Sequence, residues 1–164
     1  MNPTAYIETS VVSYLTARPS RDVVVAAYQE VTREWWRDAA ERFQLVASEL
    51  VVAEAGAGDP VAARDRLKVL EGVALLDASP DAERLAQRLL DLRAVPREAA
   101  ADAAHIAIAV TNGAEYLVTW NFRHIANAAM RVRIERACRQ AGYEPPVICT
   151  PNELMETGHG DDSA

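Results

Sequence analysis

The stretch TAYIE (residues 4–8) is a short apolar run that ends in an acidic residue, and YLVTWN (116–121) repeats the pattern with an amide at its end. Similar short runs lie at 43–47, 73–76 and 147–149, with helix-like segments between them. This alternation is typical of a parallel sheet with helices on its faces. The sequence therefore predicts an α/β fold in three layers (α/β/α), with a central, mostly parallel sheet of about five strands.

Helix signals separate the strand-like runs. An apolar stripe at spacings of three and four runs through 24–39. Asp59 and Ser79 are capping residues, and each is followed by proline at the first helical position. We also expect Thr9 or Ser10 to cap a helical turn that reaches residue 15. Further helices are expected over 49–57, 98–111 and 132–141, and the apolar second half of the 98–111 helix, interrupted at His105, should be buried.

The composition indicates one globular domain. The chain has 164 residues, half of them hydrophobic and a quarter charged, which suffices for one core. No apolar stretch approaches the roughly 20 residues of a membrane span, and no secretory signal opens the sequence. We expect a cytoplasmic protein with no membrane association, reduced buried thiols at Cys138 and Cys149, a domain over residues 1–155 and a disordered acidic tail over 156–164.

Four oxygen-bearing side chains stand at the ends of strand-like runs or the beginnings of helix-like ones: Glu8, Glu54, Asp102 and Asn121. Ligands of open parallel sheets bind outside the carboxyl ends of the strands, so we expect the fold to bring these residues together there. Clustered carboxylates repel one another unless a cation or protons neutralise them. The pattern therefore favours a site for a hard metal ion.

Each of these residues also has a structural interpretation. Asp102 could interact favourably with the dipole of the helix that it opens. Glu8 could simply end a strand, and Asn121 could form a turn. His105, three positions after Asp102, could act as an acid or base or could be a hydrogen-bonded core histidine. Asp102 is the most informative single residue, because it opens the most buried helix, and Glu54 is a lone acid among small apolar residues, which favours a functional role.

The net charge of −7 gives no support to nucleic-acid binding, but charge is unevenly distributed. Residues 121–143 hold five arginines against one acid. Arg123, Arg131 and Arg133 are candidates for contacts with phosphates, which the forked guanidinium group suits. Ordinary surface arginines from a high-GC genome would explain the same pattern.

Four motifs in this order resemble the PIN-domain family, and within it the VapC-type toxins of toxin–antitoxin pairs. They are YIETS (6–10), SELVVAE (48–54), ADAAHI (101–106) and LVTWNFRHI (117–125), and the likeness spans roughly residues 4–155. The resemblance implies a metal-dependent ribonuclease. In that family the first acid is usually aspartate, where this chain has Glu8. The fourth site position is often aspartate and sometimes asparagine, and this chain has Asn121.

The resemblance also implies roles for these residues. Glu8, Glu54 and Asp102 would hold Mg²⁺ or Mn²⁺, Asn121 would orient a water, and Ser10 or Thr119 would assist by hydrogen bonding. The partners implied are RNA, a cognate antitoxin protein and a second copy of the chain, for which the helix with Trp35 is the apolar candidate. Two alternatives remain open: an inactive PIN-like module that binds RNA or protein, and a different Mg²⁺-dependent phosphohydrolase.

Overall fold

The computed structural model describes residues 1–156 and has one five-stranded sheet, in which every neighbouring pair of strands is parallel. The strand order is β3-β2-β1-β4-β5. The strands are β1 (Thr4–Ile7), β2 (Gln44–Ser48), β3 (Ala74–Leu76), β4 (Tyr116–Val118) and β5 (Val147–Cys149). The expectation of a mostly parallel sheet of about five strands is confirmed, and this sheet is wholly parallel.

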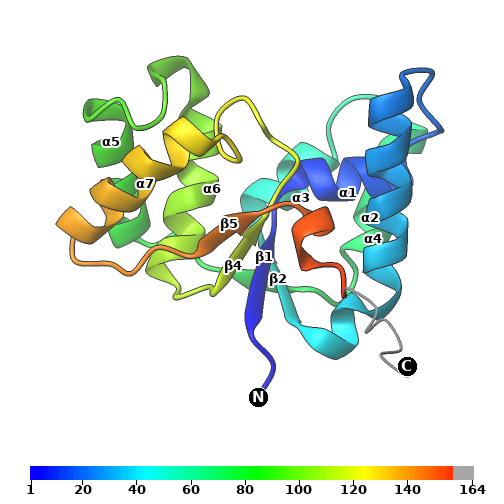
Figure 1. The fold of residues 1–164 in the computed structure, drawn as a ribbon, viewed down its shortest axis with the longest axis horizontal. Coiled ribbons are helices and arrows are strands. Elements are labelled where there is room, and N and C mark those ends of the chain that lie inside the picture. The colour runs from blue at the N-terminus through cyan, green and yellow to red at the C-terminus, as the bar shows by residue number, and fades with distance from the viewer. Residues whose placement is uncertain (157–164) are drawn as a thin grey trace, which may run out of the picture.

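Helices flank the sheet in two groups, so the three-layer α/β/α prediction is also confirmed (Figure 1). The first group is α1 (Thr9–Thr16), α2 (Val23–Arg42), α3 (Glu49–Ala55) and α4 (Pro60–Val69). The second is α5 (Pro80–Asp91), α6 (Ala100–Thr111) and α7 (Ala128–Gln140). Two short 3₁₀ turns, η1 (Arg97–Ala99) and η2 (Pro151–Leu154), complete the described chain.

The strand order places a switch point beside β1. From β1 the chain adds β2 and β3 on one side, then returns to add β4 and β5 on the other. Ile7 pairs with Val118, so the residues that follow these strands emerge next to each other. Because parallel sheets bind ligands at such a point, the topology marks the ends of β1 and β4 as the place for a site.

Helix α6 is the most buried helix, as its composition predicts. From Ala103 to Val110 only Ala104 is more than marginally exposed. His105, the one polar residue in this stretch, is 1 % exposed. A buried imidazole must satisfy its two ring nitrogens inside the protein, which makes its partners informative.

Three local expectations differ from the structure. Glu8, not Thr9 or Ser10, caps α1, because its carboxylate accepts the backbone N–H of Ser10. Helix α7 begins at Ala128, four residues before the expected start, because Asn127 accepts the N–H groups of Ala129 and Met130. The 98–111 helix begins as the 3₁₀ turn η1 and becomes α-helical only at Ala100.

The described chain forms one hydrophobic core, and the domain boundary at residue 155 stays a prediction. Of the tail expected over 156–164, only Glu156 belongs to the described residues, and it lies 3.4 Å from the Arg42 guanidinium. The remainder, 157–164, lies outside them. Within residues 1–156 no helix has the length and apolar character needed to span a membrane.

Candidate metal centre

Glu8 lies at the switch point as the residue between β1 and α1. Its backbone N–H donates to the carbonyl of Val118 at 3.1 Å, which continues the pairing of β1 with β4. The residue is 5 % exposed. Its Oε1 accepts the hydroxyls of Ser10 and Thr119, both at 2.5 Å, and its Oε2 accepts the N–H of Ser10 at 3.0 Å. Three donors therefore hold a nearly buried carboxylate in place.

The two hydroxyls also fix the chain that follows β4. Ser10 Oγ accepts the N–H of Trp120 at 2.8 Å, and Thr119 Oγ1 accepts the N–H of Asn121 at 2.9 Å. Ser10 and Thr119 each donate to Glu8 and accept a backbone N–H, and their role in assisting a reaction stays a prediction. Their contacts join the start of α1 to the end of β4 around the Glu8 carboxylate.

Glu54 comes from the last turn of α3 and faces the same site. Its Oε1 accepts the Thr9 hydroxyl at 2.6 Å and lies 2.5 Å from His105 Nε2. Burial alone would raise the pKa of this carboxyl, but the hydrogen bonds from His105 and Thr9 and the charge of His105 outweigh burial and lower the pKa. Glu54 is therefore ionised at neutral pH, and an ionised carboxylate only accepts hydrogen bonds.

A buried hydrogen-bond chain supports Glu54 from behind. His105 Nδ1 lies 2.8 Å from the Tyr6 hydroxyl, which lies 2.8 Å from Ser48 Oγ, and Ser48 Oγ accepts the N–H of Val51. Burial raises the pKa of Tyr6 above its ordinary value. Through these contacts both ring nitrogens of His105 and the hydroxyls of Tyr6 and Ser48 have a hydrogen-bond partner. The prediction of a hydrogen-bonded core histidine is confirmed, and its partner is a site acid.

Glu8 and Glu54 together fit a hard divalent cation. Single ligand atoms of Glu8, Glu54 and His105 all lie within 4.8 Å of one another. Both His105 nitrogens are already bonded, so we assign the histidine as the support of Glu54 and not as a ligand. The lone pairs of Oε1 are occupied on both glutamates, whereas each Oε2 retains acceptor capacity. Carboxylate oxygens with acceptor capacity left are the donors that Mg²⁺ and Mn²⁺ prefer.

Asp102 has a different partner. Its Oδ2 lies 2.8 Å from His124 Nδ1, and both side chains are about one fifth exposed. It does not belong to the compact group formed by Glu8, Glu54 and His105. The structure therefore brings two of the three expected acids together and pairs the third with a histidine.

Asn121 organises the turn after β4. Its side-chain Oδ1 accepts the N–H of His124 at 2.9 Å, and its backbone carbonyl accepts the N–H groups of Ile125 and Ala126. Its Nδ2 makes no hydrogen bond within residues 1–156, so that amide retains two donors. Asn121 forms the turn, as the structural interpretation had it, and keeps donors for a ligand.

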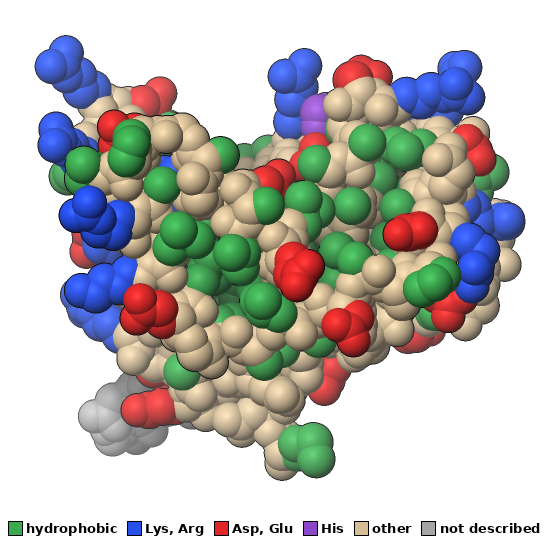
Figure 2. All heavy atoms as spheres, turned by 180° about the vertical axis from the view of Figure 1, so that it is seen from behind, with side chains coloured by type: hydrophobic (Ala, Val, Ile, Leu, Met, Phe, Trp, Pro, Cys, Tyr) green, Lys and Arg blue, Asp and Glu red, His purple; other side chains and the backbone are tan. Residues whose placement is uncertain are grey.

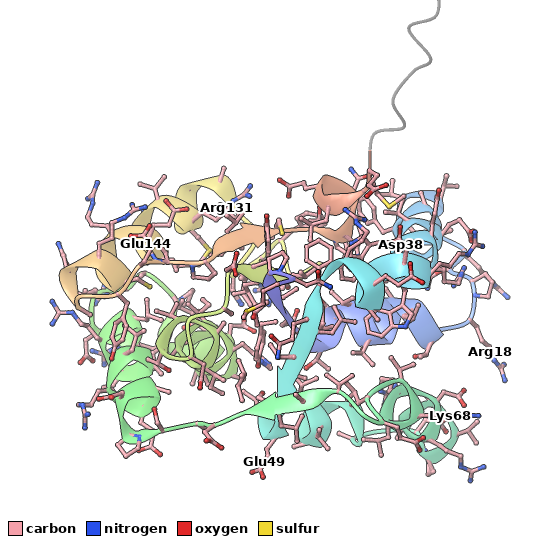
Figure 3. All side chains as sticks on the ribbon, turned by 90° about the horizontal axis from the view of Figure 1, so that it is seen from below. Arg18, Asp38, Glu49, Lys68, Arg131 and Glu144 are labelled. Atoms are coloured by element: carbon pink, nitrogen blue, oxygen red, sulfur yellow. The ribbon has the colours of Figure 1, made fainter. Side chains whose placement is uncertain are left out.

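The arginines expected to contact phosphates occupy different surroundings. Arg123 is exposed in the turn two residues after Asn121, and Arg133 is exposed on α7. Arg131, which Figure 3 places on α7 beside β5, is half-buried and donates from Nη1 to the carbonyl of Ile148 at 3.1 Å. On the face drawn in Figure 2, basic side chains gather along the edges and upper rim instead of forming one continuous patch.

The two cysteines supply no reactive thiolate near neutral pH. Both are buried and unpaired with each other, as the sequence predicts. Burial raises the pKa of Cys138 to about 11 and that of Cys149 to about 12. Because the thiolate is the nucleophilic form, both thiols are protonated, apolar parts of the core.

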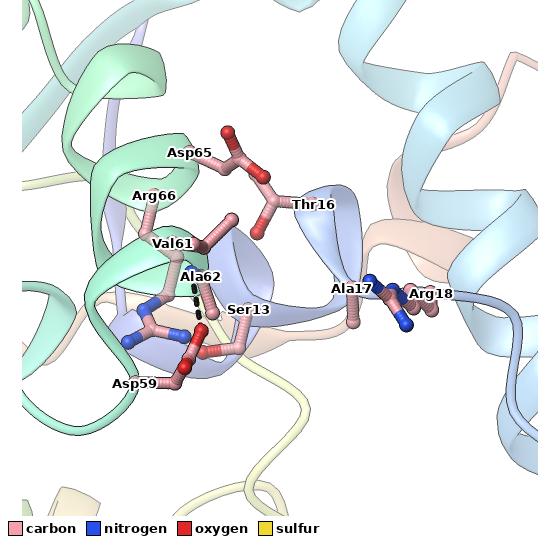
Figure 4. A pocket seen from close by; sticks show the side chains of 9 residues that line it. All are labelled: Ser13, Thr16, Ala17, Arg18, Asp59, Val61, Ala62, Asp65 and Arg66. Atoms are coloured by element: carbon pink, nitrogen blue, oxygen red, sulfur yellow. Dashed lines mark hydrogen bonds between the residues drawn. The ribbon is translucent and has the colours of Figure 1, made fainter.

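A cleft of about 580 Å³ runs between α1 and α4, and neither Glu8 nor Glu54 lines it (Figure 4). Its wall includes Ser13, one turn along α1 from Thr9, and Arg66, whose guanidinium donates to the carbonyls of Ala55 and Ala57. Two aspartates and two arginines balance its charge. The cleft is therefore separate from the group of acids at the strand ends.

We expect Tyr6→Phe to destabilise the protein by about 1–3 kcal/mol, because it leaves His105 Nδ1 and Ser48 Oγ without a buried partner. The free energy of unfolding in urea measures this. Tyr143→Phe is the matched control, since the Tyr143 hydroxyl makes no hydrogen bond within residues 1–156, and it should change little. Equal effects of the two changes would contradict the buried chain.

The lowered pKa of Glu54 predicts a pH dependence of stability. The folded pKa lies below the ordinary 4.5, so ionised Glu54 stabilises the fold above about pH 4.5, and that contribution is lost as pH falls through the folded pKa. In EDTA, the difference in unfolding free energy between wild type and Glu54→Gln should therefore shrink between about pH 7 and pH 3. A difference that stays constant over this range would show that the carboxylate is not held as described.

Sequence reasoning missed two partners of the site acids, Thr9 and His124, and two members of the chain behind His105, Tyr6 and Ser48. Thr9 and Tyr6 flank Glu8 in the sequence, and that proximity was the available signal. Ser48 and His124 lie within two of the motifs, but the sequence did not show which side chains they meet, because each meets its partner through the tertiary fold. The role of His105 as the support of Glu54 was likewise outside the reach of the sequence pattern.

Comparison with known proteins agrees with this architecture. No protein-family model matches the sequence, and no curated protein matches it. Among solved structures, a chain of the crystal structure of VapBC2 from Rickettsia felis, bound to a DNA fragment from their promoter, superposes with a TM-score of 0.55. The two are 13 % identical, and the match covers 90 % of this chain and 98 % of that one. At that identity the likeness shows the fold alone.

Proposed function

We propose that this protein is a metal-dependent endoribonuclease and the toxin of a toxin–antitoxin pair. The observation that carries the proposal is the pair Glu8 and Glu54, fixed by five hydrogen bonds at the switch point of a parallel sheet, each with an Oε2 that retains acceptor capacity. The VapBC2-like fold and the four PIN-type motifs support the same assignment.

Glu8 and Glu54 would hold Mg²⁺ or Mn²⁺, and we propose Asp102 as the third acid, reached after its bond to His124 is exchanged. When bound, such an ion supplies Lewis acidity and an activated water. An octahedral cation keeps several waters of its own, so two or three protein carboxylates are sufficient.

The remaining residues would position the substrate and the acids. Ser10 and Thr119 hold Glu8, while Thr9 and His105 hold Glu54, so neither carboxylate needs to reorganise during the reaction. The free Nδ2 of Asn121 can donate to a phosphate oxygen or to a water. Arg123 is the arginine best placed for the RNA backbone, followed by Arg133, and Arg131 would contribute through donors not used on Ile148.

Three partners belong to the proposal. RNA would be cleaved in a single strand or loop, where phosphates are accessible without opening a duplex. An antitoxin would cover the site or the arginines. A second copy could pair through α2, which exposes Val23 and Val24 and leaves Trp36 half-buried beside the core residue Trp35. These interactions would take place in the cytoplasm.

One observation favours a second candidate, a PIN-like module that binds RNA or a protein without cleaving. Asp102 is bonded to His124 and Asn121 carries no charge, so an ion would meet only two carboxylates if Asp102 stayed in place. Weak metal binding with intact RNA binding would be the signature of this alternative.

A titration with Mg²⁺ and with Mn²⁺ separates the candidates. The chain is incubated with a single-stranded RNA, a structured RNA and a generic phosphoester, with EDTA as the metal-free control. RNA cleavage that requires the ion supports the proposed function. RNA binding without cleavage at any ion concentration supports the binding module, and turnover of the small ester alone would replace both with a phosphohydrolase.

A further inference from the structure

Four aromatic side chains from three parts of the chain gather immediately beyond the metal centre. Tyr14 comes from α1, Tyr28 from α2, and Trp120 and Phe122 from the turn after β4. The Trp120 ring stacks on Tyr28 with centroids 4.5 Å apart and on Tyr14 at 5.8 Å. Phe122 packs against Trp120 at 5.9 Å and against Tyr28 at 5.6 Å. We call this group the aromatic cluster.

The base of the aromatic cluster is fixed to the protein. Trp120 is 4 % exposed, and its indole N–H donates to Thr32 Oγ1 at 2.8 Å. Its backbone N–H donates to Ser10 Oγ, the hydroxyl that also donates to Glu8. The cluster is therefore joined to the metal centre through one shared hydroxyl.

The outer member of the aromatic cluster remains open. Phe122 is 42 % exposed although it touches two aromatic rings. Its backbone N–H is bonded to the carbonyl of Trp120, and the following residues are bonded to Asn121, so the turn that presents the ring is well fixed. Arg123, the next residue, is exposed and cationic.

We propose that Phe122 is a stacking platform for one base of a single-stranded RNA, next to the phosphodiester that the metal centre would cleave. This inference rests on the proposed function and adds how the substrate is recognised. Base stacking on a protein ring is independent of sequence and needs an exposed aromatic face beside a contact for the backbone. Phe122 supplies the face, Arg123 the cationic contact, and the fixed turn limits the entropy lost on binding.

The charges of the two regions favour the phosphate at the acids and the base at the aromatic cluster. The acids at the strand ends repel a bare phosphate and accept one only with a cation between them, while the aromatic cluster carries no charge and suits a base. A duplex has its bases already stacked, so the platform should select single strands over duplexes.

The test measures binding of a single-stranded oligoribonucleotide that carries the fluorescent base 2-aminopurine, in Ca²⁺ so that a cation neutralises the acids, with electrophoresis to verify that the RNA stays intact. Wild type should quench the fluorescence as the base stacks. Phe122→Ala should raise the dissociation constant by roughly 5- to 150-fold, the range for the loss of one base–ring stack. Phe122→Tyr keeps the ring and should bind as wild type does.

Two controls isolate the stacking contribution. Val147→Ala shortens a side chain at the first residue of β5 that is 57 % exposed. That residue lies at the opposite edge of the sheet from the carboxyl ends of the strands, so the variant should bind as wild type does. An oligomer of ribose phosphates without bases should bind wild type and Phe122→Ala equally. Equal losses with the base-free oligomer, or no loss with the RNA, would overturn the platform.

The outcomes also distinguish failure of the Phe122 platform from failure of the proposed ribonuclease function. If wild type cleaves RNA with Mg²⁺ or Mn²⁺ and Phe122→Ala binds and cleaves equally well, the platform alone is wrong. If wild type neither binds nor cleaves RNA, the proposed function fails with it. A change in oligomeric state caused by Phe122→Ala, seen by light scattering, would assign the ring to a protein interface and overturn base stacking.

Discussion

Replacing Glu54 with glutamine should lower the rate of metal-dependent RNA cleavage by more than about 100-fold. Loss of a residue that merely supports a metal ligand costs roughly 10- to 100-fold in metal affinity or activity, so loss of a ligand's charge should cost more. The glutamine oxygen can still accept from Thr9 and His105, so the fold should remain intact. Cleavage rates and Mn²⁺ affinity by titration calorimetry measure the effect.

Glu49→Gln is the matched control for this variant. Glu49 begins the same helix, α3, but it is exposed, and Figure 3 shows it pointing away from the body of the protein. The same change of one carboxylate to an amide should therefore leave cleavage at the wild-type level. Retained activity in Glu54→Gln, with wild-type metal affinity, would remove Glu54 from the centre.

Asp102→Asn should also reduce cleavage by more than about 100-fold, because the proposal needs this carboxylate as the third acid. The asparagine can keep one hydrogen bond to His124, so thermal unfolding should change little. The measurement is again the rate of RNA cleavage, together with Mn²⁺ affinity. Wild-type activity in this variant would contradict the role of Asp102 as a metal ligand.

His124→Gln shows which role Asp102 has. If Asp102 acts on the ion and His124 only holds it, the histidine variant should lose about 10- to 100-fold, less than Asp102→Asn. If Asp102 serves only to orient His124, the two variants should lose equal activity and neither should weaken Mn²⁺ binding. The pair of variants therefore separates a ligand from an orienting residue.

The structure also accounts for glutamate at position 8. Compared with aspartate, glutamate extends the carboxylate by about 1.5 Å, one carbon–carbon bond. This reach lets one side chain cap α1 through the N–H of Ser10 and still accept the hydroxyl of Thr119 from the neighbouring strand. The Glu8 carboxylate thus joins α1 to β4 and also belongs to the proposed metal centre.

The sequence by itself determined the layers of the fold and the places where the acids would stand. Strand-like runs, proline after a capping residue and the apolar stretch of α6 are local signals, because each depends on residues a few positions apart. For the same reason the sequence put Glu8 and Asn121 at the ends of strands in one parallel sheet.

Only the tertiary structure decided which side chains meet. The order β3-β2-β1-β4-β5 brings Thr119 to Glu8 across 111 positions, and the packing of α6 brings His105 to Glu54 across 51. Asp102 was expected among the acids, yet His124, 22 positions later, takes its carboxylate. Such pairings depend on how strands and helices are arranged over long separations, and periodicity within a segment carries no information about them.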